Sequence, residues 1–143
     1  MPATSTLNLI QEMARLTAKA TQKASEYTAT ELWGNVRENS PTDHGRLAGS
    51  WQLRGSGTHK HLIYTNVTYA RFQNDGTGIY GPKRREITPV RAKVLAFEWN
   101  GKMVFAKSVK GVQGKKYIEK SIDQTEDRRK EFVEMAFEDV GLL

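Results

Sequence analysis

The sequence of 143 residues contains no cysteine. This absence excludes disulfide scaffolds, thiol catalysis and zinc sites built on sulfur ligands. Long apolar runs are also absent: no stretch approaches the roughly 18 to 20 residues that a membrane-spanning helix needs, and the first 30 residues hold no uninterrupted apolar segment typical of a secretory signal. We therefore expect a protein that contacts no membrane and is made and kept in the cytoplasm, or in a particle assembled there.

The remaining composition is that of one globular domain, with 38% hydrophobic and 27% charged residues. A chain of this length buries about two-thirds of the surface that is exposed when it is unfolded, so a core can form without disulfide bonds or a structural metal ion. We expect a single domain over residues 1–143. Its parts are a helical arm over 1–39, a sheet region over 40–115 with a long loop at 74–89, and a C-terminal helix over 116–143.

The net charge of +6 is distributed unevenly. Residues 1–40 carry four basic and four acidic groups, residues 41–120 carry 15 and 5, and residues 121–143 carry 3 and 7. A basic middle and an acidic tail favour one surface that meets a polyanion or an acidic protein, and another surface with the opposite preference. A well-solvated surface without a partner explains the same counts.

The N-terminal segment, residues 6–39, has the spacing of a long helix. Its apolar residues recur every three or four positions, which places them on one helix face. They are Leu9, Met13, Leu16, Ala20, Ala24 and Tyr27. After Tyr27 the stripe shifts, and β-branched residues with Gly34 indicate a bend or fraying. So narrow a stripe is typical of a helix that packs against a neighbour, including one from another chain.

The C-terminal segment also has helical spacing, from about residue 116 to residue 140, although Thr125 and Arg129 interrupt its apolar stripe. The ends of the chain are therefore expected to be helical and the middle to be sheet. This predicts an α+β fold, with an antiparallel sheet built from hairpins and a long N-terminal helix and a C-terminal helix packed on it.

Two hairpins are expected in the middle of the chain. The first pairs residues 50–54 with 59–66 around a four-residue loop, 55–58. The second, 94–107, turns at Asn100 and Gly101, the preferred pair for a type I′ turn. That turn places Leu95, Phe97 and Trp99 opposite Ala106, Val104 and Lys102 on one face, and Ala96 and Glu98 opposite Phe105 and Met103 on the other. Because both faces are substantially apolar, we expect the domain's helices to cover one side and a second subunit the other.

A turn is expected between the first helix and the first hairpin, at residues 39–45. Pro41 fixes its own φ, Asp43 caps locally and Gly45 permits a positive φ. Pro41, Asp43, Gly45, Asn100 and Gly101 are therefore the predicted structural turn residues.

The segment 74–89 reads as a long loop, first rich in glycine and then basic at Lys83, Arg84 and Arg85. Loops of this length inside compact domains are usually functional, or they become ordered on a partner. Residues 76–81 match the G-x-G-x-x-G pattern of dinucleotide sites. That pattern works between a strand and a helix, and neither flank has such periodicity, so we expect no nucleotide cofactor.

Other chemical constellations are incomplete. His59 and His61 share one side of a predicted strand, but spacing supplies no third metal ligand, and two solvent-facing histidines explain the pattern. Asp43 beside His44 lacks a nucleophile to complete a triad. We therefore expect no metal, no cofactor, no small-molecule substrate and no catalysis.

The basic residues of the loop, with Arg91 and Lys93 beyond it, suit more than one partner. They can neutralise nucleic-acid phosphates while Phe72 and Tyr80 stack on bases. Docking on an acidic protein surface uses the same groups. A solvated loop without a partner explains them as well.

Several segments, taken in order, resemble one family. They are Ser-Pro-Thr-Asp-His-Gly-Arg-Leu-Ala-Gly-Ser-Trp at 40–51, Tyr-Thr-Asn-Val-Thr-Tyr-Ala at 64–70, Asp-Gly-Thr-Gly at 75–78, the hairpin at 95–107, and Gly-Lys-Lys-Tyr-Ile at 114–118. Together, over about residues 35–122, they resemble the minor tail component or neck protein family of long-tailed bacteriophages. Two positions depart from that family's pattern, since it often has Thr where His44 stands and Glu where Asn74 stands.

The resemblance implies a structural virion protein that forms a ring, a hexamer being favoured, around the DNA channel. The ring is expected at the head–tail junction or the head-proximal end of the tail, after assembly in the host cytoplasm. Implied partners are further copies of the chain, connector or stopper proteins, tail-tube or tail-terminator proteins, and the genomic DNA in the lumen. The alternative is a small basic nucleic-acid-binding protein.

With this family role, the long loop is the expected contact with partners, ordered when the chain joins its neighbours. Its predicted contact residues are Asp75, Gly76, Thr77, Gly78, Tyr80, Lys83, Arg84 and Arg85.

Overall fold

The computed structural model describes residues 2–42 and 45–143, and it has the expected α+β fold. The chain forms two compact units. We call them the helical unit, made of residues up to 66 with residues 118–143, and the loop unit, residues 67–117. The single domain expected over residues 1–143 stays a prediction.

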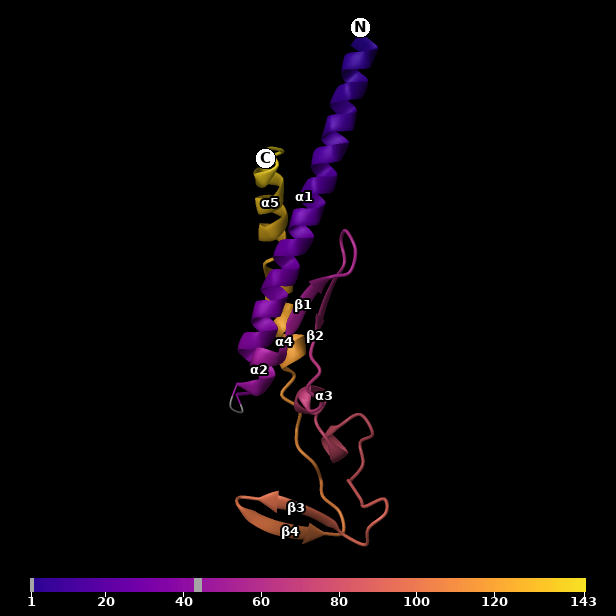
Figure 1. Ribbon diagram of the computed structural model, residues 1–143, viewed down its shortest axis with the longest axis vertical. Helices are drawn as coiled ribbons and strands as arrows, with labels where there is room; N and C mark the ends of the chain where they lie inside the picture. Colours follow the sequence, from indigo (N-terminus) through magenta and orange to yellow (C-terminus); the bar gives the residue numbers. More distant parts are fainter. Residues whose placement is uncertain (1, 43–44) are drawn as a thin grey trace. The chain divides into compact units, whose positions relative to one another are not determined.

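The helical unit is organised around one helix, α1 (Pro2–Asn39), which continues through Gly34 without the expected bend. Helix α5 (Arg129–Asp139) lies alongside its middle part (Figure 1). Small side chains, Ala20 and Ala29 of α1 and Ala136 of α5, are buried, and they let two helix backbones approach closely. The C-terminal part of the narrow apolar stripe on α1 thus packs against α5 of the same chain.

The C-terminal segment forms two helices where one was expected, α4 (Tyr117–Asp127) and α5. The backbone N–H of Arg128 donates to the Thr125 carbonyl at 3.1 Å, a tight turn that ends α4. The second difference is that α5 packs on α1 and not on a sheet. Thr125, which interrupts the apolar stripe, is buried and accepts a 3.0 Å hydrogen bond from the Asn35 side chain.

Further polar contacts join α1 to α4. The Asn39 side-chain amide donates to Ser121 Oγ at 3.0 Å and to Gln124 Oε1 at 2.7 Å. The face between α1 and α4 is therefore specified by paired polar groups, which a search for apolar periodicity does not detect.

A buried network closes the end of α1. Ser40 Oγ donates to the Val36 carbonyl at 2.6 Å and accepts the Trp51 indole N–H at 2.9 Å. The Trp33 indole N–H donates to the Trp51 carbonyl at 2.9 Å. Between Ser40 and Trp51 lies a short helix not foreseen from the sequence, α2 (Arg46–Ser50).

The first hairpin pairs β1 (Gln52–Gly55) with β2 (His61–Tyr64), Gln52 opposite Tyr64. Both strands are shorter than expected, and Gly55 is the last residue of β1 and pairs with His61. The loop is therefore 56–60 and not 55–58. It is closed by a 2.8 Å bond from the Ser56 N–H to the Lys60 carbonyl.

The loop unit contains α3 (Ala70–Asp75), the short 3₁₀ helix η1 (Gly78–Tyr80), and the hairpin of β3 (Leu95–Trp99) with β4 (Lys102–Ala106). The hairpin has the register expected from the sequence, from Leu95 opposite Ala106 to Trp99 opposite Lys102. The two hairpins form separate two-stranded sheets.

The two faces of the β3–β4 hairpin differ in exposure. The face with Phe97 and Val104 is half-buried, whereas Met103 and Phe105, on the other face, are 59% and 67% exposed. Trp99, at the tip, is 62% exposed. The face with Met103 and Phe105, which we call the outer face of the hairpin, is thus apolar and exposed.

Candidate partner-binding groove

The segment 74–89 is held in place by the residues that follow the β3–β4 hairpin. The Thr77 N–H donates to the Val112 carbonyl and the Ile79 N–H to the Lys110 carbonyl, both at 2.8 Å. Ile87 and Val109 exchange two backbone bonds of 2.9 and 3.0 Å. The loop is therefore hydrogen-bonded within the single chain, and the expectation that it becomes ordered on joining its neighbours stays a prediction.

Glycines make this pairing possible. Gly78 has a φ of 60°, and a Cβ built on it lies 2.0 Å from the Lys110 carbonyl oxygen. A Cβ on Gly111 lies 2.2 Å from the Thr77 carbonyl oxygen. The G-x-G-x-x-G pattern at 76–81 therefore serves close packing of two backbones, and the three-residue η1 within it offers no long helix terminus for a phosphate.

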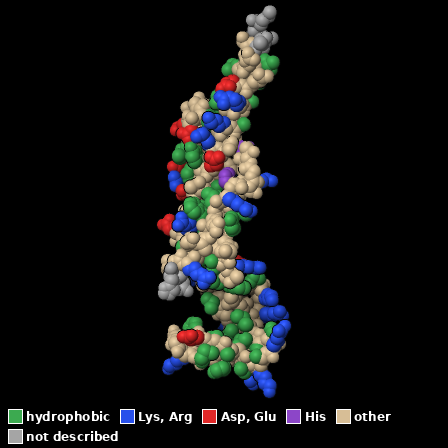
Figure 2. Space-filling model, viewed as in Figure 1, with side chains coloured by type: hydrophobic (Ala, Val, Ile, Leu, Met, Phe, Trp, Pro, Cys, Tyr) green, Lys and Arg blue, Asp and Glu red, His purple; other side chains and the backbone are tan. Residues whose placement is uncertain are grey.

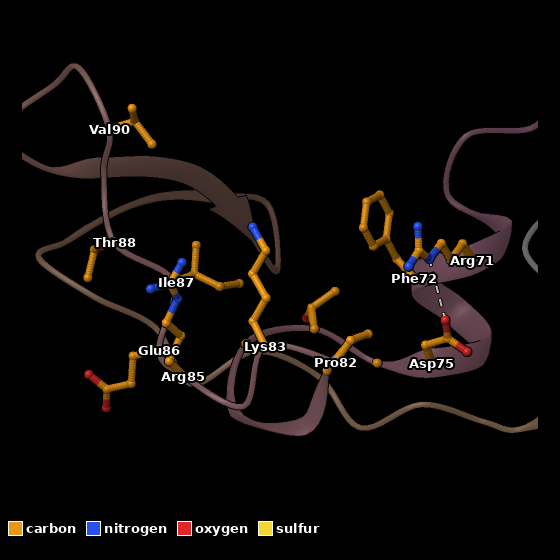
Figure 3. A pocket seen from close by; sticks show the side chains of 14 residues that line it. Arg71, Phe72, Asp75, Pro82, Lys83, Arg85, Glu86, Ile87, Thr88 and Val90 are labelled. Carbon is orange, nitrogen blue, oxygen red and sulfur yellow. Dashed lines mark ion pairs between the residues drawn. The ribbon is translucent and has the colours of Figure 1, made fainter.

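The same segment borders a groove of about 1000 Å³, entirely within the loop unit (Figure 3). Six of the eight predicted contact residues line it: Asp75, Gly76, Thr77, Gly78, Lys83 and Arg85. Tyr80 and Arg84 do not line it, although both are exposed. Arg84 has a φ of 49°, and its backbone N–H donates to the Gly81 carbonyl at 3.1 Å.

Other groove residues were not among these eight, although Phe72 was considered as a residue that stacks on nucleic-acid bases. They are Arg71, Phe72, Gly81, Pro82, Glu86, Ile87, Thr88 and Val90. Arg71 and Phe72 belong to α3, which is too short to leave a periodic signal in the sequence. Ile87 and Val90 lie near Pro89 in a segment whose sequence is typical of a polar loop. Only their apolar side chains, unusual in such a loop, could have indicated a role in binding a partner.

The groove combines positive charge with apolar surface. Arg71 Nε lies 3.5 Å from Asp75 Oδ2, and this ion pair neutralises the charge of Arg71. Within the described chain, Lys83 and Arg85 have no carboxylate partner. Figure 3 shows Lys83 rising between Phe72 and Ile87, with the Glu86 carboxylate pointing the other way. Phe72 is 57% exposed and Val90 is 96% exposed.

The predicted turn residues lie elsewhere. Gly45 has a φ of 70° and precedes the first residue of α2. Asn100 and Gly101 have φ values of 50° and 76°, as a type I′ turn requires. Pro41 is half-buried and follows Ser40. Asp43 and His44 lie outside the described residues.

His59 and His61 both contact α1 in the helical unit. His61 begins β2, and its Nδ1 lies 3.2 Å from Ser25 Oγ. The same hydroxyl donates to the His59 carbonyl at 3.1 Å, and His59 lies in the loop and not on a strand. Among the residues that the structure describes, no three side chains of metal-ligating type gather. Within the same residues, no helix is long and apolar enough to span a membrane.

Comparison with known protein families finds a match in the N-terminal half of the chain. Residues 6–76 match the family model described as "Bacteriophage HK97-gp10, putative tail-component". The match covers α1 from residue 6 onward, α2, the first hairpin and α3, and it ends at the first glycine of the groove. Neither a curated protein nor a solved structure matches the chain.

Proposed function

We propose that the chain is a structural protein of the neck, because residues 6–76 match the family model of a bacteriophage tail component. In this proposal, copies of the chain join head to tail into a ring at the head–tail junction or at the head-proximal end of the tail. The free energy of association does the work, with no covalent step.

The observation that carries the proposal is a pair of separate apolar surfaces. The first is the N-terminal part of α1, where Leu7 and Ile10 are 54% and 58% exposed. The second is the outer face of the β3–β4 hairpin with Met103 and Phe105. Contiguous exposed apolar groups on different elements mark association sites. A closed ring needs two different surfaces that meet at each interface.

The finer features of the ring are part of the same proposal. We favour a hexamer that encircles the genomic DNA. A connector or stopper protein lies on one side, and a tail-tube or tail-terminator protein on the other. The ring is assembled in the host cytoplasm before it becomes part of the virion.

A gene deletion in the phage that carries this chain tests the role. The proposal predicts particles in which full heads and tails accumulate without joining, or tails whose head-proximal end is incomplete, and rescue by the gene supplied from a plasmid. Virions with normal morphology and infectivity after the deletion contradict it. A frameshift in the same gene that leaves the mRNA intact is the matched control for effects on neighbouring genes.

A second candidate, a small basic nucleic-acid-binding protein, has one observation in its favour. Arg71, Lys83 and Arg85 lie in one groove with Phe72, the combination that single strands use. Fluorescence anisotropy with labelled DNA separates the two roles. DNA affinity that exceeds the affinity for purified neck and tail proteins, and that falls steeply with salt, supports this alternative.

A further inference from the structure

The groove of the loop unit is suited to an occupant that carries both anionic and apolar groups. Lys83 and Arg85 have no carboxylate partner in the described chain, so an anionic occupant can form ion pairs with them. Phe72, Ile87 and Val90 require apolar side chains. A phosphate backbone supplies anions but little apolar surface, so an acidic, partly apolar protein segment matches the groove better than nucleic acid does.

Helix α5 presents such a surface. Phe132 and Ala136 are buried, which fixes the helix on α1 and turns its opposite face outward. Glu131, Glu134 and Glu138 are all exposed at spacings of three and four residues, so they form one outward row.

The outward row keeps two anions available. Glu131 accepts bonds of 3.0 Å from Arg128 Nε and Nη2 and is therefore satisfied within the helix. Glu134 and Glu138 have no ion-pair partner among the described residues. Met135, three residues before Glu138 and therefore next to it on the helix surface, is 40% exposed. The face thus offers two anions together with one apolar side chain, the counterpart of the groove.

The charge distribution supports pairing between these two regions. The loop unit, residues 67–117, carries 11 basic and 3 acidic residues, whereas residues 121–143 carry 3 and 7. In Figure 2, Lys and Arg side chains predominate over the loop unit, and Asp and Glu side chains lie mainly along the helices. Opposite charges on two different surfaces of one chain favour head-to-tail contact between copies and disfavour pairing of like surfaces.

We propose that the groove of the loop unit binds the outward face of α5 from a neighbouring copy, with Lys83 and Arg85 opposite Glu134 and Glu138 and with Met135 against the apolar side chains of the groove. This inference rests on the proposed ring, and it names the contact that repeats at each interface. Since each copy carries one groove and one α5, the contact propagates around a closed ring.

Cross-linking is the direct test, because the native chain has no cysteine to interfere. One batch of full-length chain carries Lys83→Cys and another carries Glu138→Cys. The two are mixed under assembly conditions and treated with a short bis-maleimide. The proposal predicts a covalent heterodimer between the two batches, whereas Lys60→Cys with Glu138→Cys, the control pair, gives at least tenfold less. No heterodimer above the control overturns the inference, and so does a cross-link that forms only within a single Lys83→Cys, Glu138→Cys chain.

Charge reversal provides the second test. The variants Lys83→Glu with Arg85→Glu, and Glu134→Lys with Glu138→Lys, are each expected to weaken self-association in sedimentation velocity about tenfold or more. A mixture of the two variants regains most of that affinity, because the reversed surfaces again carry opposite charges. Lys60→Glu with Lys120→Glu makes the same change in net charge on exposed residues outside the groove and the β3–β4 hairpin, and should leave self-association unchanged.

The possible failures are distinguishable. If the particle contains the ring but neither charge reversal changes assembly, the groove contact is overturned and the proposed function is not. Reversal at Lys83 and Arg85 that abolishes DNA binding but leaves self-association intact overturns the inference in favour of nucleic acid. A chain that is absent from the virion removes the proposed function itself, whatever the cross-linking shows.

Discussion

Replacing Gly78 with Ala should unfold the pairing that shapes the groove. The added Cβ lies 2.0 Å from the Lys110 carbonyl oxygen, and a contact under 3.0 Å forces a neighbour to shift. The neighbour is backbone, so the shift breaks the 2.8 Å bond from Ile79 and strains the 2.8 Å bond from Thr77 to Val112. Two backbone bonds at about 1 kcal/mol each, with about 1 kcal/mol for a side chain at positive φ, give a local cost of about 3 kcal/mol.

Amide hydrogen exchange followed by NMR measures this cost at the affected bonds. A loss of about 3 kcal/mol lowers protection of the Thr77 and Ile79 amides by about 100-fold, since each 1.4 kcal/mol is a factor of ten. Amides of α1 and α5, in the helical unit, should keep their protection.

Two glycine controls separate the causes. Gly101 has a φ of 76°, and a Cβ added there has nothing within 4 Å, so Gly101→Ala reports the backbone strain alone. Gly49 has open space and no positive φ, so Gly49→Ala reports neither effect. If Gly78→Ala lowers protection no more than Gly101→Ala does, then residues 77–79 and 110–112 do not approach as closely as described, and the reasoning is refuted.

Three further perturbations test other parts of the molecule. Ser40→Ala removes the acceptor of the buried Trp51 indole N–H and should lower the free energy of unfolding by about 1–3 kcal/mol in urea titration, with exposed Ser56→Ala as the unchanged control. The hydrogen bond from Tyr27 to Asp139, aided by desolvation and by the carboxylate charge, raises the pKa of Tyr27 above its usual value of about 10. That bond therefore stabilises the fold fully below about pH 10 and is lost as the pH rises through the raised pKa, so the stability difference between the native chain and Tyr27→Phe should shrink in alkaline solution and would stay constant if the bond were absent. Met103→Ser with Phe105→Ser removes apolar surface from the outer face of the β3–β4 hairpin and should weaken self-association in sedimentation velocity without lowering the melting temperature; weakened folding with unchanged association would show that the face packs within the chain.

The features that the sequence predicted correctly have a local physical cause. The register of β3 with β4 follows from Asn100 and Gly101, because a two-residue turn with two positive φ values leaves only one pairing of the strands. Helix α1 follows from an apolar repeat that extends over many turns.

The features that it did not predict depend on partners far away in the chain. The groove exists because residues 76–79 pair with 110–113, and glycines on both segments permit the approach. No local pattern in either segment indicates that it pairs with the other segment. The α1–α4 contact is similarly hidden, since Asn35 with Thr125, and Asn39 with Ser121, are polar pairs that interrupt an apolar stripe. Within the candidate site, Lys83, Arg85 and Phe72 were singled out from the sequence, but Arg71 and Val90 join them only through the fold.

The central claim is that copies of this chain meet one another in the virion. A single-particle reconstruction of the head-proximal end of the tail tests it most directly. The account predicts a closed ring whose repeating density is the α1 helix with its two C-terminal helices, and in which the loop unit of each copy contacts the next copy. A tail end that lacks this density in particles that contain full-length protein, or that holds the chain as isolated copies which do not touch, contradicts the account.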